Sequence, residues 1–325
     1  MFNFQDLPDE LVLKVLSYSK TKDLISCGQV SKRIRRISRD GTLWVTANLK
    51  KKIVKTELLE MILGKGCRIL DLRNSTILGS LSSNIKSQLI VLKFSSQSEE
   101  RLCENTLNVL EKILLSCYSL QHLAMEDVFL TPKMVDGICK NSKTLQTLNL
   151  SLSFLGETNL QKIIKCCQEL KEVDLAYVQD IYFEFLAENM PPNVEKLNLA
   201  GNLIIDNEVK TLFSRCNKIK ALNLEATQIT DDTFINIKQY LNLTLEELSM
   251  RLDLGNDFLT RSLISFRGFL ELKSMPRLKI LNLNYENGDD EKIQFLRQHL
   301  SHLMIKVSSP YELAPKLKER GHFYF

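Results

Sequence analysis

The stretch that decides the fold is Lys218–Leu248, KIKALNLEATQITDDTFINIKQYLNLTLEEL. It begins with Ile219, Leu222 and Leu224 at a spacing that predicts a short strand. A polar turn follows, and then apolar residues recur every three to four positions, which predicts a helix. The strand spacing returns at Leu245. One strand and one helix cannot enclose a core, so this unit must stack on copies of itself.

The same strand phrase recurs along the chain at a nearly constant period. Its last apolar residue is found at Leu72, Phe94, Met125, Leu150, Leu175, Leu199, Leu224, Met250 and Leu283, with a final candidate at Ile305. From Met125 to Met250 the steps are 25, 25, 24, 25 and 26 residues, inside the leucine-rich-repeat window of roughly 20–29 residues. The predicted fold class is therefore α/β, a curved leucine-rich-repeat solenoid of about ten repeats with a parallel concave sheet.

Composition excludes several classes of protein. Of the 325 residues, 44% are apolar and 25% are charged, which is typical of a soluble protein. No run of 18 apolar residues occurs, so no transmembrane helix is expected. The start, MFNFQDLPDE, does not resemble a secretory signal. The eight cysteines are scattered, which favours reduced thiols in nucleus and cytoplasm over a disulfide framework.

Positive charge gathers near the N-terminus. Residues 1–66 carry a net charge of +6 and the remainder −2. The excess comes from Lys32, Arg33, Arg35, Arg36, Arg39 and Lys50–Lys52. A solvated helix face explains this cluster. The alternative, a nucleic-acid binder, would need a broader basic face with interleaved aromatic residues.

Residues 1–48 do not share the repeat period. Pro8, Asp9 and Glu10 form a favourable helix start, and the apolar spacing that follows predicts three short helices. Such a small segment has a marginal core and leaves apolar side chains over. We expect it to complete its core against a partner or against the adjoining repeats.

The residues of this segment carry a family resemblance. In order they are LPDELVLKVLSY at residues 7–18, Asp23-Leu24, VSKRIRRIS at residues 30–38, and Leu43-Trp44. This order resembles an F-box, and with the repeats the chain resembles F-box/leucine-rich-repeat proteins of the S-phase-kinase-associated type. The expected domains are a three-helix F-box at 1–48, a linker helix at 49–66, repeats at 67–308 and a tail at 309–325.

The resemblance implies a partner, the small adaptor that links F-box proteins to a cullin. Residues at motif positions that face or support this adaptor are Leu7, Pro8, Leu11, Leu24, Val30, Lys32 and Trp44. For Leu11, Leu24 and Val30 a purely structural role in the helical core is equally open. Trp44 could instead form the joint between the F-box and the first repeat.

The resemblance also implies a role. The chain would be the substrate receptor of an SCF-type cullin–RING ubiquitin ligase, without catalytic residues of its own. A phosphorylated cell-cycle substrate and a small accessory protein are compatible with it. The alternative is a leucine-rich-repeat scaffold or inhibitor with no link to a ligase.

Residues between the strand leucines point to the concave face. The expected substrate-binding residues are Asp174, Tyr177, Asn198, Asn223, Glu225, Arg251, Asn282 and Tyr285. This small, polar set suits an extended protein partner and lacks the aromatic ladder that binds single-stranded nucleic acid. Glu225 and Arg251 either reach one ligand together or simply pair with each other.

No catalytic motif is present. Gly64-Lys65-Gly66 lacks the phosphate-loop spacing, and neither G-x-S-x-G, H-E-x-x-H nor C-x-x-C occurs. Neither a cofactor nor a metal is expected, because Cys166-Cys167 has no second ligand pair nearby. Cys117, Cys167 and Cys216 each precede a strand phrase by three residues, with Ser142 in the equivalent place. We expect these positions to end repeat helices inside the stack.

Overall fold

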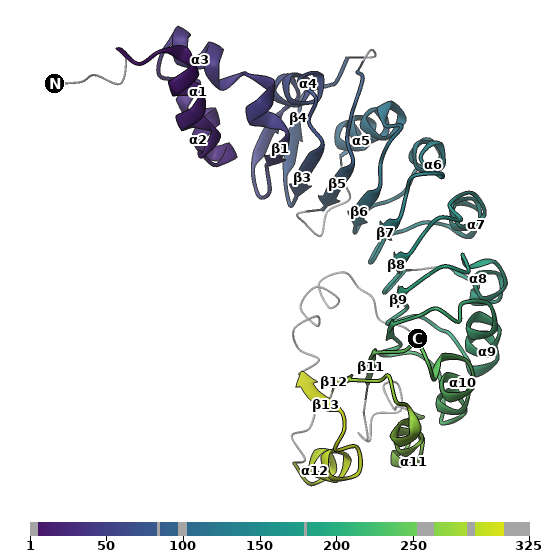
Figure 1. Ribbon diagram of the computed structural model, residues 1–325. Coiled ribbons are helices and arrows are strands. Elements are labelled where there is room, and N and C mark those ends of the chain that lie inside the picture. The colour runs from purple at the N-terminus through teal and green to yellow at the C-terminus, as the bar shows by residue number, and fades with distance from the viewer. Residues whose placement is uncertain are drawn as a thin grey trace. The chain divides into compact units, whose positions relative to one another are not determined.

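The structure is a computed structural model that describes residues 6–82, 85–96, 103–178, 181–251, 263–284 and 290–308. Tyr285 and the tail 309–325 lie outside the described residues. The chain forms two compact units, Met1–Leu145 and Gln146–Phe325. In each unit, strands line up side by side and repeat helices run along one face of the sheet, as Figure 1 shows.

The first unit begins with the three predicted short helices. They are α1 (Asp9–Ser17), α2 (Thr21–Cys27) and α3 (Lys32–Ser38), followed by the 3-10 turn η2 (Gly41–Trp44). The acidic first turn of α1 suits the helix dipole, and Ser31 caps α3 by accepting a 3.1 Å hydrogen bond from the Ile34 amide. The core of these helices contains Val12, Leu16, Leu24, Ile34, Ile37 and Trp44.

The rest of the first unit consists of the first repeats. Its strands are β1 (Thr46–Asn48), β2 (Ile53–Lys55), β3 (Ile69–Arg73), β4 (Thr76–Leu78), β5 (Val91–Ser95) and β6 (His122–Glu126). Its helices are α4 (Thr56–Gly64), α5 (Glu104–Ser116) and α6 (Pro132–Lys140). Strands β1, β3, β5 and β6 form a parallel sheet in that order, and β2 pairs with β4.

The helix expected from Leu49 to Leu63 is shorter than predicted. It begins only at Thr56, because the preceding residues belong to a strand and to the edge of the sheet. The Leu49 amide donates to the Asp71 carbonyl at 2.8 Å, and β-branched Ile53 and Val54 lie in β2. The first strand of the sheet, β1, therefore follows the F-box helices directly.

Among the described residues, the second unit repeats the strand–helix pattern six times and then adds a last strand. Its strands are β7 (Thr147–Asn149), β8 (Glu172–Asp174), β9 (Lys196–Asn198), β10 (Ala221–Asn223), β11 (Glu247–Arg251), β12 (Ile280–Asn284) and β13 (Met304–Ser308), which pair in that order. Its helices are α7 (Glu157–Cys166), α8 (Phe183–Asn189), α9 (Asp206–Arg215), α10 (Asp232–Leu241), α11 (Phe266–Leu270) with the turn η3 (Glu271–Ser274), and α12 (Asp290–His299).

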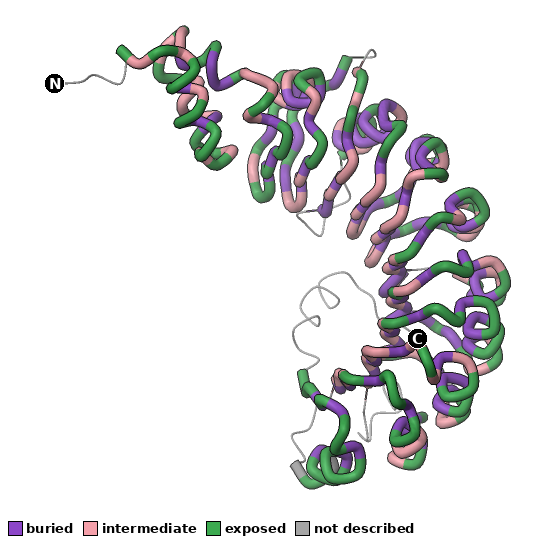
Figure 2. The backbone as a smooth tube through the Cα atoms, viewed as in Figure 1, coloured by how far each residue is buried: buried purple, intermediate pink, exposed green. Residues whose placement is uncertain are grey.

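The leucines that set the period form the core, as predicted. Leu148, Val173, Leu197, Leu222, Leu248 and Leu281 lie in register on successive strands and are all buried. Figure 2 shows buried residues alternating with half-buried ones along the strands. The alternation leaves the sheet face opposite the helices, the open face, to polar residues.

Strands β1, β3, β7, β8, β9 and β10 end in the same turn, which the sequence pattern did not predict. The side-chain Oδ1 of an outward Asn or Asp accepts a hydrogen bond from the amide two residues later, as in Asn149 to Ser151 (2.9 Å) and Asn223 to Glu225 (2.9 Å). The residue after that amide adopts a left-handed conformation, with φ of 58° at Lys51, 54° at Asn74, 60° at Leu152, 54° at Tyr177, 69° at Gly201 and 51° at Ala226. This local bond competes with the ladder and ends the strand.

The cysteine positions are partly as predicted. Cys117, Cys167 and Cys216 are buried, and burial raises the pKa of their thiols to about 11, 12 and 12 respectively. Ser142, however, is only half-buried, and its neighbour Asn141 fills the interior. Asn141 donates from Nδ2 to the Cys117 carbonyl at 3.1 Å and accepts from the Leu120 amide at 2.9 Å, which ties two repeats together.

Candidate binding surfaces

The segment before α1 is held against α3. Arg33 donates from Nη2 to the carbonyl oxygen of Leu7 at 2.5 Å and from Nε to Asp9 Oδ1 at 2.8 Å. Arg36 also pairs with the Asp9 carboxylate. These contacts fix the position of half-buried Leu7 and exposed Pro8 at the leading edge of the F-box.

The pKa of Asp9 agrees with these contacts of Arg33 and Arg36, which we call the Arg33 clamp. The hydrogen bond from Arg33 is the main reason that the pKa of Asp9 lies below its ordinary value, and the charges of Arg33 and Arg36 add to it. Desolvation works in the opposite direction and is outweighed. Asp9 therefore stays ionised near neutral pH and bridges the first and third helices.

An apolar stripe lies exposed on α1. Leu11 and Val15 are 50% and 48% exposed, and Tyr18 at the end of the helix is 82% exposed. Spacings of four and three residues place them on one helix face. Val15 and Tyr18 were not predicted as binding residues, although the helical spacing from Leu11 indicates both. A stripe of this kind on a small domain favours a protein partner.

The predicted adaptor-binding residues fall into two groups. Leu11, Pro8, Lys32 and Val30 are exposed, and Leu7 is half-buried. Leu24 and Trp44 are buried, and the indole Nε1 of Trp44 donates a 2.7 Å hydrogen bond to the Ser38 carbonyl. In this chain Leu24 and Trp44 thus support the helices from inside, and Trp44 forms the joint to the first strand.

The open face of the second unit contains a shallow groove of about 370 Å³ across β7 to β11. Its polar lining consists of Thr147, Asn149, Glu172, Asp174, Lys196, Asn198, Asn223, Glu247 and Ser249. Three predicted residues, Asp174, Asn198 and Asn223, line it. Glu225, Arg251, Asn282 and Tyr177 are outside its lining.

The prediction missed the first outward residue of each strand. Thr147, Glu172, Lys196 and Glu247 line the groove, and Glu172 pairs with Lys196 at 2.7 Å across β8 and β9. The alternation that identified Asp174 extends two residues back to Glu172, so the signal was present in the sequence.

Two carboxyl groups of the predicted set are substantially shielded from water. Burial raises the pKa of Asp174 even though Asp174 accepts hydrogen bonds from the Ala176 amide (3.0 Å) and Asn198 Nδ2 (3.1 Å). Burial likewise raises the pKa of Glu225, opposed by a 3.3 Å hydrogen bond from Asn284 and by the charge of Arg251. The charge of Arg251 therefore acts on the Glu225 carboxylate.

Tyr177 packs on its neighbouring repeat. A Cβ added to Gly201 would come within 2.0 Å of Tyr177 Cδ1, so the ring lies directly against the Gly201 backbone. This contact assigns the tyrosine a packing role next to the groove. Asn282 donates to Glu247 Oε1 at 2.7 Å and to Ser249 Oγ at 3.0 Å, and so connects β12 to the groove.

The described residues contain neither a membrane-spanning helix nor a group of metal ligands. None of their helices combines the length and the apolar character that crossing a bilayer requires. Within the same residues, no three His, Cys, Asp or Glu side chains converge as a metal site would need.

Comparisons with known proteins divide the chain into two matched regions. Residues 56–314 match the family described as the SKP2 LRR domain, and residues 4–50 match the family described as F-box-like. Among solved structures, the chain is similar to the crystal structure of an internalin C2 from Listeria monocytogenes str. 4b F2365. That match has 17% sequence identity and a TM-score of 0.37, and covers 64% of this chain and 79% of that chain.

Proposed function

Because the chain belongs to the F-box/leucine-rich-repeat family with a repeat domain of the SKP2 type, we propose that it is the substrate-recognition subunit of an SCF-type cullin–RING ubiquitin ligase. The observation that carries this proposal is the F-box surface. There the clamped Leu7–Pro8 edge and the stripe of Leu11, Val15 and Tyr18 are presented together on α1 and the residues before it.

The adaptor would cover this surface. Half-exposed apolar side chains such as Leu11 and Val15 gain binding free energy when a partner removes them from water. Buried Leu24 and Trp44 keep the helices in place below. The adaptor in turn connects the chain to the cullin complex, where the catalytic steps occur on other subunits.

The repeats would hold the protein substrate on their open face. The groove across β7 to β11 offers alternating acidic, basic and amide side chains, which suit the main chain and polar side chains of an extended segment. The chain contributes to rate by raising the effective concentration of substrate lysines near the ubiquitin-carrying enzyme. It acts without covalent chemistry of its own.

We further propose a cell-cycle substrate, which is either phosphorylated or not and is bound with or without a small accessory protein, and a location in nucleus and cytoplasm. These extensions depend on the resemblance and not on particular contacts of this chain. A repeat scaffold without a ligase role is the alternative, and adaptor binding separates the two.

The test is a calorimetric titration of the adaptor into the whole chain and into a Leu7→Ala, Pro8→Ala double variant. We expect the double variant to lose at least ~2 kcal/mol of binding free energy, the scale of an interface hot spot. A matched control is Leu243→Ala, an exposed leucine in the second unit. Absence of adaptor binding by the unaltered chain would refute the ligase proposal and leave the scaffold.

A further inference from the structure

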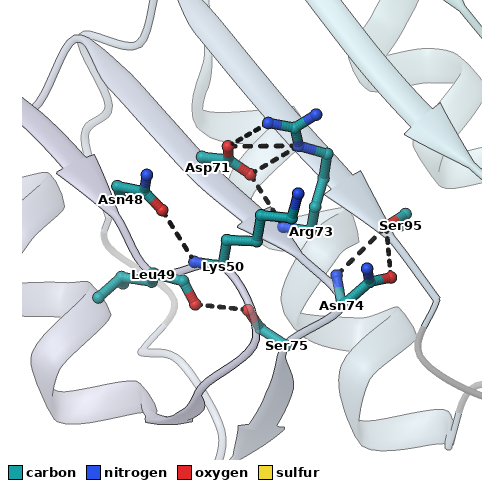
Figure 3. Close-up of polar contacts among 8 residues, drawn as sticks. All are labelled: Asn48, Leu49, Lys50, Asp71, Arg73, Asn74, Ser75 and Ser95. Carbon is teal, nitrogen blue, oxygen red and sulfur yellow. Dashed lines mark hydrogen bonds and ion pairs between the residues drawn. The ribbon is translucent and has the colours of Figure 1, made fainter.

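The open face of the first unit has a cluster of cations on its first three strands. The register pairs Asn48 with Asp71 and Asp71 with Lys93. The Lys51 amide donates to the Arg73 carbonyl at 3.0 Å and extends this ladder, so Lys50 lies beside Arg73. Neighbouring strands are about 4.8 Å apart. Lys50, Arg73 and Lys93 therefore surround Asp71 on one face. Figure 3 shows Asp71 with Lys50 and Arg73.

One carboxylate balances only one of these three charges. Arg73 grips Asp71 in a forked contact, with Nε to Oδ1 at 3.0 Å and Nη2 to Oδ2 at 2.6 Å (Figure 3). Burial alone would raise the pKa of Asp71, but the hydrogen bonds from Arg73 and the charge of Lys93 hold it below its ordinary value. Asp71 is thus a fixed anion whose hydrogen-bonding capacity is taken by Arg73.

The remaining positive charge is available for a ligand. Lys50 is exposed and Lys93 half-buried, and among the described residues neither ammonium group makes a hydrogen bond or an ion pair. Like charges side by side on adjacent strands repel, as Lys50 and Arg73 must. A second carboxylate, Glu126 on β6, also acts on Arg73, but the strand of Ser95 lies between them. Three cations still face two anions on this face.

We propose that the cluster of Lys50, Arg73 and Lys93 binds carboxylates of an acidic, extended protein segment. The inference rests on the proposed function, since that segment would belong to the substrate. Lys50 and Lys93 each supply a mobile ammonium donor, and the guanidinium of Arg73 is already oriented by Asp71. An anion placed between them relieves the repulsion that the folded chain otherwise retains.

The spacing fits a peptide that crosses the strands. Lys93 lies on β5, and Lys50 follows two residues after the end of β1. The two lysines are therefore offset by two strands, roughly 9.6 Å, across the sheet and by two residues, roughly 6.6 Å, along it. Alternate residues of an extended segment are roughly 6.6 Å apart and every third residue roughly 10 Å apart. The combined offset is roughly 12 Å, so acidic residues three or four positions apart on the segment match the span between the two lysines.

A nucleic acid fits this face less well. The outward residues of β1, β3, β5 and β6 include no Phe, Tyr or Trp, and the imidazole of His122 is their single ring on which a base could stack. The fixed carboxylate of Asp71 and that of Glu126 would also oppose a continuous phosphate backbone. Isolated carboxylates on a protein segment avoid both difficulties.

The test uses the whole chain and fluorescent peptides in anisotropy titrations. One peptide alternates glutamate with glycine, and its control replaces each glutamate by glutamine. The test variant is Lys50→Glu with Lys93→Glu. The charge-matched control is Lys55→Glu with Lys86→Glu, two exposed lysines of the same unit outside the cluster. Arg73 is left unchanged because its removal would leave Asp71 unpaired.

We expect the glutamate peptide to bind at least about tenfold more tightly than the glutamine peptide, and more weakly as salt is added. The test variant should lose at least about tenfold in affinity, with the control variant within about twofold of the unaltered chain. Equal loss in both variants, equal binding of both peptides, or displacement of the peptide by mixed-sequence single-stranded DNA that binds more tightly would overturn the inference.

Adaptor binding, measured on the same samples, separates this inference from the proposed function. The adaptor surface lies on residues before β1, so the test variant should bind the adaptor normally. Failure of adaptor binding with a normal glutamate response would remove the ligase role and leave the acidic-segment site. The reverse result would leave the ligase role and remove the site.

Discussion

Arg33 on α3 donates a 2.5 Å hydrogen bond from Nη2 to the carbonyl oxygen of Leu7, 26 residues earlier in the chain. The leading edge of the F-box is therefore positioned by its third helix and not by its own local structure. Asp9 completes the link through Arg33 and Arg36. The shape of the surface offered to an adaptor therefore depends on Arg33, a side chain that contacts the Leu7 carbonyl and Asp9.

Loss of Arg33 should weaken adaptor binding without unfolding the repeats. In Arg33→Ala, the Leu7 carbonyl loses its side-chain donor and Asp9 keeps only its contact with Arg36, so the leading edge becomes less firmly held. We expect adaptor affinity to fall about tenfold, because ordering that edge then opposes binding. Calorimetric titration measures the change, and hydrogen exchange should show faster exchange at the Leu11 and Val12 amides.

Two further variants make this prediction specific. Arg33→Lys retains the charge but lacks the two guanidinium donors that reach Asp9 and the Leu7 carbonyl at once. Its affinity for the adaptor should therefore lie between those of the unaltered chain and Arg33→Ala. Arg39→Ala removes an exposed cation at the end of the same helix and should change little. If Arg33→Ala and Arg39→Ala weaken binding equally, the effect is one of net charge and the clamp has no positioning role.

The repeat register predicts the stability of the second unit. Leu148 and Leu197 are buried between sheet and helices, so Leu148→Ala and Leu197→Ala should each reduce the free energy of unfolding by about 2–5 kcal/mol. Urea denaturation provides the measurement. Leu203→Ala, at an exposed turn position, is the control, with an expected change below about 0.5 kcal/mol. Equal effects at the buried and exposed positions would contradict the register.

The repeats were predictable because each is a local unit whose apolar spacing is visible in the sequence. The period alone identifies Leu148, Leu197 and Leu222 as core residues, and the number of repeats predicts the number of strands. The limits of the F-box core were harder to predict. Leu24 and Val30 are both apolar, and the sequence assigns each of them equally well to the core or to the adaptor interface. Only the packing shows that Leu24 is buried and that Val30 is 72% exposed.

The sequence predicted which polar residues lie on the open face, but it did not predict the hydrogen bonds that they make. Alternation correctly put Asp174, Asn198 and Asn223 on the open face. It could not show that each side chain accepts a bond from the amide two residues later, which leaves fewer acceptors for a ligand. That bond depends on a turn conformation, and a left-handed residue such as Tyr177 is not one that sequence alone would suggest.

The contact of Tyr177 with Gly201 predicts a specific non-additivity. Gly201→Ala introduces a Cβ at a φ of 69° and 2.0 Å from the tyrosine ring, and should destabilise the chain by at least ~1 kcal/mol. Gly156→Ala has a similar φ of 66° with open space around the new Cβ, so it isolates the backbone strain. In a Tyr177→Ala background, Gly201→Ala should cost less by at least ~0.5 kcal/mol, as measured by a double-mutant cycle.

The raised pKa values of Asp174 and Glu225 predict a stability change with pH. A carboxyl group whose pKa is higher in the folded than in the unfolded chain favours folding most below its ordinary pKa, and this contribution is lost as pH rises through the folded pKa. Asp174→Asn and Glu225→Gln should therefore gain stability relative to the unaltered chain between about pH 4 and about pH 7.

Asparagine already occupies the position of Asp174 in the neighbouring repeats, at Asn149 and Asn198, so the substitution keeps the turn. Denaturation at several pH values measures the effect, with exposed Glu188→Gln on α8 as the control. Parallel stability curves for Asp174→Asn and the unaltered chain would show that the burial of this carboxyl group has no energetic consequence.

The last prediction concerns the partner of Glu225 and Arg251 and rests on the proposed function. The double exchange Glu225→Arg with Arg251→Glu keeps opposite charges at the two positions but reverses the field that a substrate meets. Folding should persist, because Asn284 Oδ1, which is buried without a hydrogen-bond partner among the described residues, can accept from the new guanidinium. A charge placed at that site then remains satisfied.

We expect substrate ubiquitination by the reconstituted ligase to fall at least about tenfold, with adaptor binding and melting temperature unchanged. The single variant Glu225→Gln distinguishes loss of one carboxylate from reversal of the pair, and should have the smaller effect. A large fall in activity with little change in stability would point to contact with the substrate and not to a loss of folding. A normal rate in the exchanged protein would instead place the substrate elsewhere on the open face and leave Glu225 and Arg251 as partners of each other.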